Sequence, residues 1–267
     1  QLGYLAACDK ELKVWRLGDE HAPVVHVALD KTCDGLRVSP DERRLAYSLG
    51  VSTALIDLGS GATLAEVEHP GDFSLQHPNT VAWTSDQGHV LTRHEDWVAV
   101  RHPGTLAVEG RLRTGTTITL AVAPDGKTFA VASPERVSIA QIEDAAELRT
   151  LAVAGARVLE FSPDGSWLAV GLESGAVRLW SLPDFAHEQL VGHTATVASL
   201  EFGPNDLLVS GSDDDTAIVW ELGGTWTSTR FERHRSDVIF ARLLDNGRDL
   251  VTVGDSELRL WCVEAQR

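Results

Sequence analysis

His193, Ser210 and Asp214 are the residues of this chain whose types could act together in catalysis. A serine nucleophile, a histidine base and an orienting carboxylate form the triad of many hydrolases. The sequence around the serine, Val209-Ser210-Gly211, lacks the G-x-S-x-G pattern that presents a nucleophile on a sharp turn. We therefore predict no catalytic residue in this chain and interpret the three side chains as parts of a structural hydrogen-bond network.

Side chains that ligate metals are frequent in the chain, but they lack the spacing of a metal site. One histidine-rich stretch contains His69, His77, His89, His94 and His102. It has neither H-x-H nor H-E-x-x-H spacing, so solvated loop histidines are the simpler interpretation. The run Asp213-Asp214-Asp215 lacks the Gly and the bidentate Glu of a calcium-binding loop. Three cysteines, Cys8, Cys33 and Cys262, have no metal-type spacing either, and we predict no metal and no cofactor.

The charge and the hydropathy of the chain exclude several classes of partner. Acidic residues number 39 and basic residues 23, which gives a net charge of −16. Such a field repels phosphate backbones, so nucleic acid is not expected as a partner. No apolar run approaches the ~18 residues of a membrane span, so no membrane partner is expected. The first residues have neither the basic nor the apolar region of a signal peptide, so we do not expect a retained one. The cysteine usage fits a reducing compartment, and we predict a cytoplasmic location.

A short pattern recurs about every 40 residues along the whole chain. It is an apolar pair followed by a polar and another apolar residue, in places loosely kept. Its copies are Val14-Trp15-Arg16-Leu17, Leu55-Ile56-Asp57-Leu58, Ala99-Val100-Arg101-His102, Ile139-Ala140-Gln141-Ile142, Leu179-Trp180-Ser181-Leu182, Val219-Trp220-Glu221-Leu222 and Leu260-Trp261-Cys262-Val263. The second positions are 41, 44, 40, 40, 40 and 41 residues apart. Seven marks at so even a spacing indicate a repeat architecture.

Each repeat contains the signals of four short strands and of tight turns between them. Turns resembling Ser-Pro-Asp-Gly, such as Ser162-Pro163-Asp164-Gly165, follow one apolar run and precede an alternating one. A four-stranded sheet cannot bury both of its faces alone, so neighbouring sheets must stack around an axis. The sequence therefore predicts an all-β fold, a seven-bladed β-propeller made of four-stranded antiparallel blades.

These repeats resemble those of the WD-repeat family, most strongly in the last three units. In that family a His, a Ser or Thr, an Asp and the Trp form a hydrogen-bonded structural tetrad. The resemblance places one tetrad in the sixth unit and one in the seventh, at His193, Ser210, Asp214 and Trp220 and at His234, Thr252, Asp255 and Trp261. The fifth unit keeps Trp180 but has Ala154-Gly155-Ala156 where Gly-His would be expected. The family's members imply a protein-interaction function.

The two ends of the chain contain fewer strand signals than a full repeat. The first unit enters at its second strand and the seventh stops after its third, so we expect both terminal blades to be incomplete in this chain. We predict that residues 1–267 form a single propeller domain. The chain begins with Gln1 and contains no Met, so we expect it to be a piece of a longer multidomain protein.

Charged residues gather where hairpin tips and linking loops should emerge on one face of the propeller. The set is Lys10, Arg93, Glu95, Asp96, Glu135, Arg136, Glu173, Asp213, Asp215, Arg233, Arg235, Asp237 and Glu257. Acidic residues outnumber basic ones in it, so we predict a partner that carries a Lys- or Arg-bearing segment.

Three functions are compatible with the predicted fold. The first is a non-enzymatic scaffold or sensor module that binds a partner protein or another domain of its own chain. The second is a ligand, metal or catalytic site in the central channel, which the mainly apolar or small residues of the first strands disfavour. The third is self-assembly through unpaired edge strands at the incomplete terminal blades. Metal analysis would discriminate the second from the first, and a mass measurement over a concentration series would expose the third.

Overall fold

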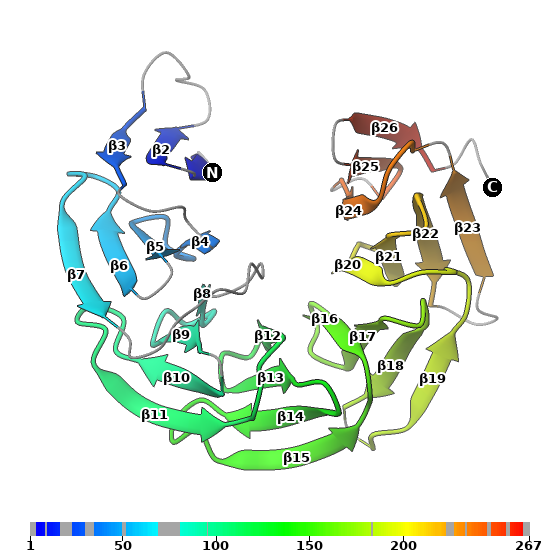
Figure 1. Ribbon diagram of the computed structural model, residues 1–267, viewed down its shortest axis with the longest axis horizontal. Helices are drawn as coiled ribbons and strands as arrows, with labels where there is room; N and C mark the ends of the chain where they lie inside the picture. The colour runs from blue at the N-terminus through cyan, green and yellow to red at the C-terminus, as the bar shows by residue number, and fades with distance from the viewer. Residues whose placement is uncertain are drawn as a thin grey trace. The chain divides into compact units, whose positions relative to one another are not determined.

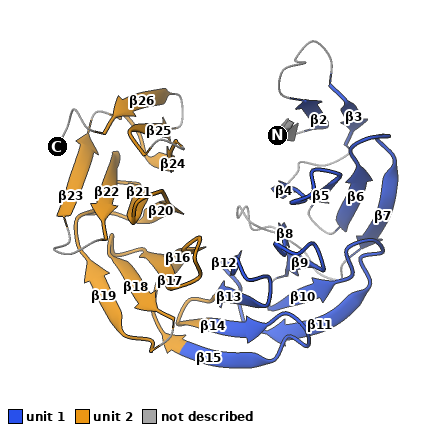
Figure 2. Ribbon diagram, turned by 180° about the vertical axis from the view of Figure 1, so that it is seen from behind, with its two compact units in different colours: residues 1–131, 138–150 blue, residues 132–137, 151–267 orange. Residues whose placement is uncertain are grey.

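The computed structural model of the protein describes residues 4–8, 10–16, 23–29, 35–49, 52–68, 81–94, 96–182, 184–222, 227–232, 234–244, 247–254 and 257–263. Within these ranges the regular secondary structure consists of strands, and no helix occurs. The chain divides into two compact units (Figure 2). Unit 1 comprises residues 1–131 and 138–150, and unit 2 comprises residues 132–137 and 151–267.

Unit 1 contains three whole sheets and most of a fourth (Figure 1). The first sheet consists of β1 (Tyr4–Cys8), β2 (Glu11–Arg16) and β3 (Val25–Ala28). The second consists of β4 (Gly35–Val38), β5 (Arg44–Leu49), β6 (Ser52–Asp57) and β7 (Thr63–Glu68). The third consists of β8 (Val81–Trp83), β9 (Val90–Arg93), β10 (Trp97–Arg101) and β11 (Val108–Arg113). The fourth consists of β12 (Thr119–Val122), β13 (Thr128–Ala132), β14 (Arg136–Gln141) and β15 (Glu147–Ala152).

Unit 2 contains the remaining three sheets. One consists of β16 (Ala156–Phe161), β17 (Trp167–Leu172), β18 (Val177–Ser181) and β19 (His187–Leu190). The next consists of β20 (Val197–Phe202), β21 (Leu207–Ser212), β22 (Thr216–Glu221) and β23 (Thr227–Glu232). The last consists of β24 (Val238–Leu243), β25 (Asp249–Gly254) and β26 (Leu258–Cys262).

Strand order within every sheet follows the sequence, so each sheet is a small meander. The strand pairs whose register is resolved are antiparallel, as β20–β21 and β21–β22 illustrate. Across the described residues there are seven sheets, and the first and the last have three strands each. The predictions of an all-β chain, of seven repeated sheets and of incomplete terminal sheets are therefore confirmed.

The Pro-Asp turns join the first two strands of most sheets, and their side chains fix the turn. In the turn before β17, the Ser162 hydroxyl donates to Asp164 Oδ1 at 2.6 Å, and the backbone N–H of Ser166 donates to the same oxygen at 3.0 Å. Gly165 follows with φ of 72°, a left-handed conformation that glycine adopts without steric cost. These local bonds set the position of the first residue of β17.

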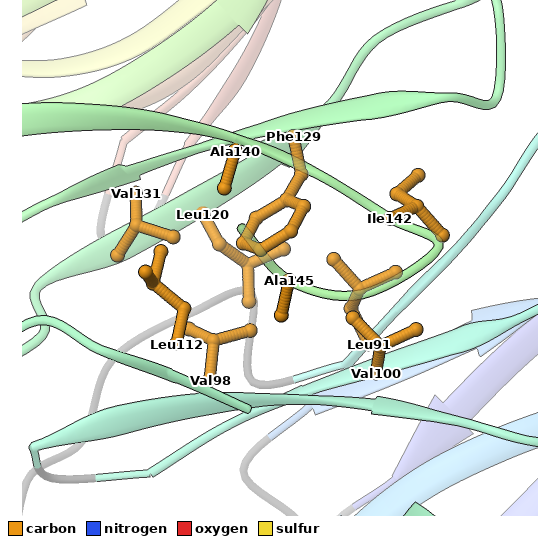
Figure 3. Packing of buried hydrophobic residues seen from close by; sticks show 10 residues of the cluster. All are labelled: Leu91, Val98, Val100, Leu112, Leu120, Phe129, Val131, Ala140, Ile142 and Ala145. Carbon is orange, nitrogen blue, oxygen red and sulfur yellow. The ribbon is translucent and has the colours of Figure 1, made fainter. Parts of the chain in front are cut away.

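Buried apolar side chains alternate along the strands and meet between neighbouring sheets. A cluster in unit 1 illustrates this packing (Figure 3). Its members are Leu91, Val98, Val100, Leu112, Leu120, Phe129, Val131, Ala140, Ile142 and Ala145. Phe129 and Val131 lie two residues apart on β13, so they point to the same face of that strand. Phe129 is fully buried and points into this cluster.

Replacing Phe129 with Ala should lower the free energy of unfolding by about 3–5 kcal/mol, because the lost ring leaves a cavity in a packed cluster. Leu148→Ala is the matched control, since Leu148 lies on the same sheet with 52% of its surface exposed. Its cost should stay within about 0.5 kcal/mol. Denaturant unfolding of both variants measures the difference. Equal costs would show that the Phe129 cluster does not stabilise the fold.

Candidate functional site

Four predicted tetrad residues of the sixth repeat lie in contact in the sheet of β20–β23. His193 precedes β20, Ser210 is on β21, Asp214 is in the turn between β21 and β22, and Trp220 is on β22. The indole N–H of Trp220 donates to Ser210 Oγ at 2.9 Å. Ser210 Oγ lies 2.8 Å from His193 Nε2, and His193 Nδ1 lies 3.1 Å from both carboxylate oxygens of Asp214. The four side chains form one continuous hydrogen-bonded chain.

The strand register explains why these side chains meet. Trp220 pairs with Leu208, two residues before Ser210, so indole and hydroxyl lie diagonally on one face of the sheet. The tight turn carries Asp214, whose carboxylate accepts from the Thr216 hydroxyl at 2.6 Å and from the backbone N–H of Thr194 at 2.8 Å. The carboxylate thereby ties the loop before β20 to the hairpin of β21 and β22.

The direction of each hydrogen bond in this network follows from which of its atoms can donate. Because the indole can only donate, the Ser210 oxygen accepts from Trp220, and the hydroxyl proton is then available to His193 Nε2. His193 Nδ1–H then donates to Asp214. Burial lowers the pKa of His193, although the adjacent Asp214 carboxylate opposes this effect. Burial of Asp214 would raise its pKa, but hydrogen bonds from Thr216 and Thr194 and the charge of His193 keep that pKa below its ordinary value.

The same Ser–His–Asp order occurs in hydrolases, but the surroundings of Ser210 do not suit catalysis. Ser210 has 0% of its surface exposed, and its Oγ already accepts a hydrogen bond from the Trp220 indole N–H. His193 is only 5% exposed. A nucleophile must reach a substrate atom, and this serine is covered on all sides in the structure.

The sheet of β24–β26 carries a second network, and a carboxylate oxygen of Glu257 lies beside its histidine. His234 Nε2 lies 2.6 Å from Thr252 Oγ1, which accepts from the Trp261 indole N–H at 2.7 Å. His234 Nδ1 lies 3.1 Å from an oxygen of Glu257. The predicted fourth member, Asp255, lies outside the described residues. Glu257, predicted as a partner-binding residue, instead faces His234 and pairs with Arg259 at 2.8 Å.

The third sheet holds a related network that the sequence analysis missed. Val90 pairs with Arg101 as Leu208 pairs with Trp220, so Arg101 rather than Val100 occupies the tryptophan position of this repeat. Arg101 Nε donates to Thr92 Oγ1 at 2.8 Å, and that oxygen lies 3.0 Å from His94 Nε2. The repeat spacing does not reveal this shift, because moving the mark from Val100 to Arg101 changes the steps from 44 and 40 residues to 45 and 39.

This third-sheet network is buried and carries a cation. Arg101 is 4% exposed, and burial together with nearby Arg111 lowers its pKa to about 10, so it stays protonated near neutral pH. His94, 1% exposed, stacks on Trp97 with ring centroids 3.6 Å apart. The guanidinium of Arg111 lies 4.6 Å from the centroid of the Trp97 ring. Trp97 is therefore held between two flat polar groups.

Arg93, predicted to belong to a partner-binding face, has a buried side chain. It is only 6% exposed, and its Nη1 donates to the carbonyl of Thr117 at 2.6 Å. Arg93 pairs with Val98 as Gly211 pairs with Ala217, which is the last register pair before the hairpin turn in each sheet. Arg93 therefore lies beside its hairpin turn with its side chain buried, and its role in partner binding remains a prediction.

The other residues of that set occupy different environments. Lys10, Asp96, Glu173, Asp213, Asp215 and Arg235 are exposed, Arg136 and Glu257 are partly buried, and Arg233 lies outside the described residues. Two of the exposed acids have a basic neighbour: Glu173 lies 3.0 Å from Arg157, and Asp96 lies 3.9 Å from Arg113.

Hairpin tips and linking loops of unit 2 are joined at one end of their sheets by backbone hydrogen bonds. The N–H of Gly155 donates to the carbonyl of Pro134 at 2.9 Å, and that of Glu173 donates to the carbonyl of Gly155 at 2.8 Å. The N–H of Asp213 donates to the carbonyl of Thr196 at 3.0 Å. Three hairpin tips are thus fixed to the loops beside them, as the predicted face requires.

Neither a metal-binding cluster nor a membrane-spanning helix occurs in the described ranges. No group of three or more His, Cys, Asp or Glu residues there could hold a metal ion. No helix in these ranges is long and apolar enough to span a membrane.

The first strands are less apolar than predicted from the sequence, because Glu201 on β20 pairs with Arg242 on β24 at 3.1 Å. Burial raises the pKa of Glu201, and Arg242 opposes this effect.

Replacing Trp220 with Phe should destabilise the protein by about 1–2 kcal/mol, because Ser210 loses a buried donor. Trp180→Phe is the matched control: Trp180 pairs with Leu168 as Trp220 pairs with Leu208, and both are 5% exposed. Its sheet lacks the network histidine, so its replacement should cost less. Thermal unfolding measures both, and an equal loss would argue against the network.

Acidification should destabilise the protein through two of its buried histidines, His193 and His234. The pKa values of His193 and His234 are lowered from 6.5, mainly by burial, so the unfolded chain binds their protons more readily than the folded one. Their stabilising contribution is complete above that value and is lost as the pH falls toward the folded pKa. The melting temperature should therefore fall between about pH 7.5 and about pH 5.5. A smaller fall is expected in a His193→Gln/His234→Gln variant, and an unchanged fall would refute the assignment.

Comparison with known proteins relates these sheets to a family. The model of the WD domain, G-beta repeat, matches residues 148–181 and 186–221. Protein HIR1 of Kluyveromyces lactis is 32% identical over 98 residues, 30% of this chain and 11% of that protein. A probable cytosolic iron-sulfur protein assembly protein 1 of Cryptococcus neoformans is 29% identical over 132 residues, 41% of this chain and 30% of that protein. The matches thus span less than a third of either relative.

A solved structure shows the same fold over most of the chain. The C-terminal WD40 domain of Sif2 superposes with a TM-score of 0.74 at 20% sequence identity, covering 87% of this chain and 70% of that one. At this identity the likeness concerns the fold alone. The chain thus contains two recognised WD40 repeats, at residues 148–181 and 186–221, and it has the fold of a WD40 β-propeller.

Proposed function

We propose that this chain is a non-enzymatic protein-interaction module that binds a partner through hairpin tips of its blades. WD40 propellers generally mediate interactions between proteins, and one relative is named as an assembly protein. The partner is a protein or another domain of the same chain, and it carries a basic segment. A cytoplasmic location, absence of catalysis and a single domain over residues 1–267 remain predictions that agree with this proposal.

The observation that carries the proposal is an acidic tip row in unit 2, made of Glu135, Glu173, Asp213 and Asp215. All four residues are exposed, and they lie on the three hairpin tips that backbone bonds fix to neighbouring loops. A fixed row of like charges costs little further ordering when an oppositely charged segment binds. It also attracts such a segment from a distance, which raises the association rate at low salt.

The buried network supports the position of part of this row. Asp214 lies between Asp213 and Asp215 and is held by His193, Thr194 and Thr216. Its two neighbours are therefore presented to solvent by a turn whose central residue cannot easily move. In this arrangement the buried carboxylate stabilises the turn, while the exposed ones remain available to a partner.

The test is a pull-down with the chain at low and moderate salt, with captured proteins identified by mass spectrometry and their affinity then measured. A Glu173→Gln/Asp213→Asn/Asp215→Asn variant should raise the Kd of the partner by about tenfold or more at low salt, since each lost charge contact contributes up to about 1 kcal/mol. The matched control is Glu143→Gln/Asp184→Asn/Glu188→Gln, which removes three exposed carboxylates that do not lie on these tips.

The control variant should bind as the unmodified chain does. Equal binding by both variants would refute the tip row as the binding surface. Absence of any protein partner, with a metal or a small molecule co-purifying instead, would favour the alternative of a site in the central channel.

A further inference from the structure

A groove of about 430 Å³ lies between two sheets of unit 2, at the ends of the strands opposite the acidic tip row. The Pro-Asp turn before β17 forms one side, and the turn between β20 and β21 forms the other. Its apolar wall includes Trp167, Phe202 and Leu222, which are partly buried and pack against a hydrophobic cluster. A groove of this volume accommodates a side chain with its flanking backbone.

The charge of this groove is entirely acidic. Asp164 and Asp206 line it and are both exposed, and none of its described lining residues is Lys, Arg or His. Hydrogen bonds from Ser162 and Ser166 lower the pKa of Asp164 to about 2, so this carboxylate is ionised at neutral pH. A cation is therefore the complementary occupant.

At the equivalent place in unit 1, an arginine of the chain itself contacts an aromatic ring, a carbonyl and a carboxylate. Arg44 follows the turn residue Ser39 by five positions, as Trp167 follows Ser162. Its guanidinium lies 4.9 Å from the centroid of the Trp83 ring. Its Nη1 donates to the carbonyl of Pro103 at 2.7 Å, and its Nη2 lies 3.7 Å from Asp41.

The partners of Arg44 correspond in position to the walls of the unit 2 groove. Trp83 ends the first strand of its sheet as Phe202 ends β20. Arg101 occupies the register position of Trp220 in its own sheet. Pro103 lies two residues after Arg101, as Leu222 lies two residues after Trp220. The turn carboxylate Asp41 likewise corresponds to Asp164. The groove of unit 2 therefore keeps an aromatic wall and a carboxylate but lacks the arginine.

A second groove, between the sheets of β8–β11 and β12–β15 in unit 1, contains basic residues. It has a volume of about 510 Å³, and Lys127 and His89 line it together with Asp86, Asp125 and Glu143. The groove with Trp167 differs from it, because its described lining has carboxylates and no basic side chain.

The backbone of the unit 2 groove holds one of the two carboxylates in a fixed turn. Asn205 and Asp206 have φ of 58° and 56°, a left-handed conformation that Asn and Asp adopt more readily than other non-glycine residues. The carbonyl of Asp206 accepts from the N–H of Leu222 at 2.8 Å, which fixes the turn against the wall of the groove.

We propose that the groove formed by Asp164, Trp167, Phe202, Asp206 and Leu222 binds an arginine side chain of a partner protein. The guanidinium stacks on the indole of Trp167 and pairs with the carboxylates, while the aliphatic stem packs on Leu222. Within this chain, Arg44 shows that a guanidinium at the equivalent place contacts an aromatic ring, a backbone carbonyl and a turn carboxylate. The groove is separate from the acidic tip row, so the two sites can bind independently.

The test follows the Trp167 indole resonance in protein with 15N-labelled tryptophan, assigned by its loss in Trp167→Phe. The probe is the capped peptide acetyl-Gly-Ser-Arg-Ser-Gly-amide, titrated into the millimolar range, where a single side-chain anchor binds. The matched peptide contains citrulline, which has the shape of arginine without its charge. We expect a saturable shift of the Trp167 resonance with the arginine peptide and a much weaker one with citrulline.

Two variants locate the binding site. Asp206→Asn places a residue that also tolerates the left-handed conformation at this position. It should lower the affinity for the arginine peptide by about two- to fivefold. Asp213→Asn, at the opposite end of β21, should leave its affinity unchanged. An unshifted Trp167 resonance, equal shifts with both peptides, or equal weakening by both variants would overturn the proposal. Because the readout is at Trp167, its outcome does not depend on whether the tip row binds a partner.

Discussion

The need to pair every buried polar group underlies the local structure of this protein. A hydroxyl, an imidazole and an indole N–H lie together between the strands of the sheet of β20–β23, where each would cost about 1–3 kcal/mol if left without a partner. Ser210 satisfies two of them at once, since its oxygen accepts from Trp220 and lies 2.8 Å from His193. Asp214 completes the chain at the hairpin turn, and through it the loop before β20 is fixed to that turn.

Related networks in two other sheets use different residues. In the sheet of β24–β26 the carboxylate beside His234 belongs to Glu257. In the sheet of β8–β11 the donor to the hydroxyl is a guanidinium, that of Arg101, and the imidazole is that of His94. The geometry of donor, hydroxyl and imidazole is therefore kept while the side chains change. Such networks tie adjacent strands together and leave the outer surfaces of the turns free to vary.

The variable outer surfaces of the turns carry the residues that are particular to this chain. At one end of the unit 2 sheets, exposed carboxylates such as Glu173 and Asp213 stand on tips fixed by backbone bonds. At the other end, the groove beside Trp167 differs from the equivalent place in unit 1, because the position that holds Arg44 there holds an aromatic residue instead. A rigid repeated frame lets single substitutions of this kind create or remove a binding surface without altering the fold.

The all-β fold, the seven repeats, the strand positions and the members of the His193 network could be predicted from the sequence. These features follow from local patterns in the sequence: alternation of apolar residues, turn residues at fixed offsets and a period near 40 residues. The tertiary structure was needed to place Arg101 at the tryptophan position, to bury Arg93 and to bring Glu257 to His234. The groove beside Trp167 could not be read from the sequence either, because its walls come from two sheets about 40 residues apart. Contacts across strands and between sheets depend on register and packing, and a shift of one residue reverses which face a side chain occupies.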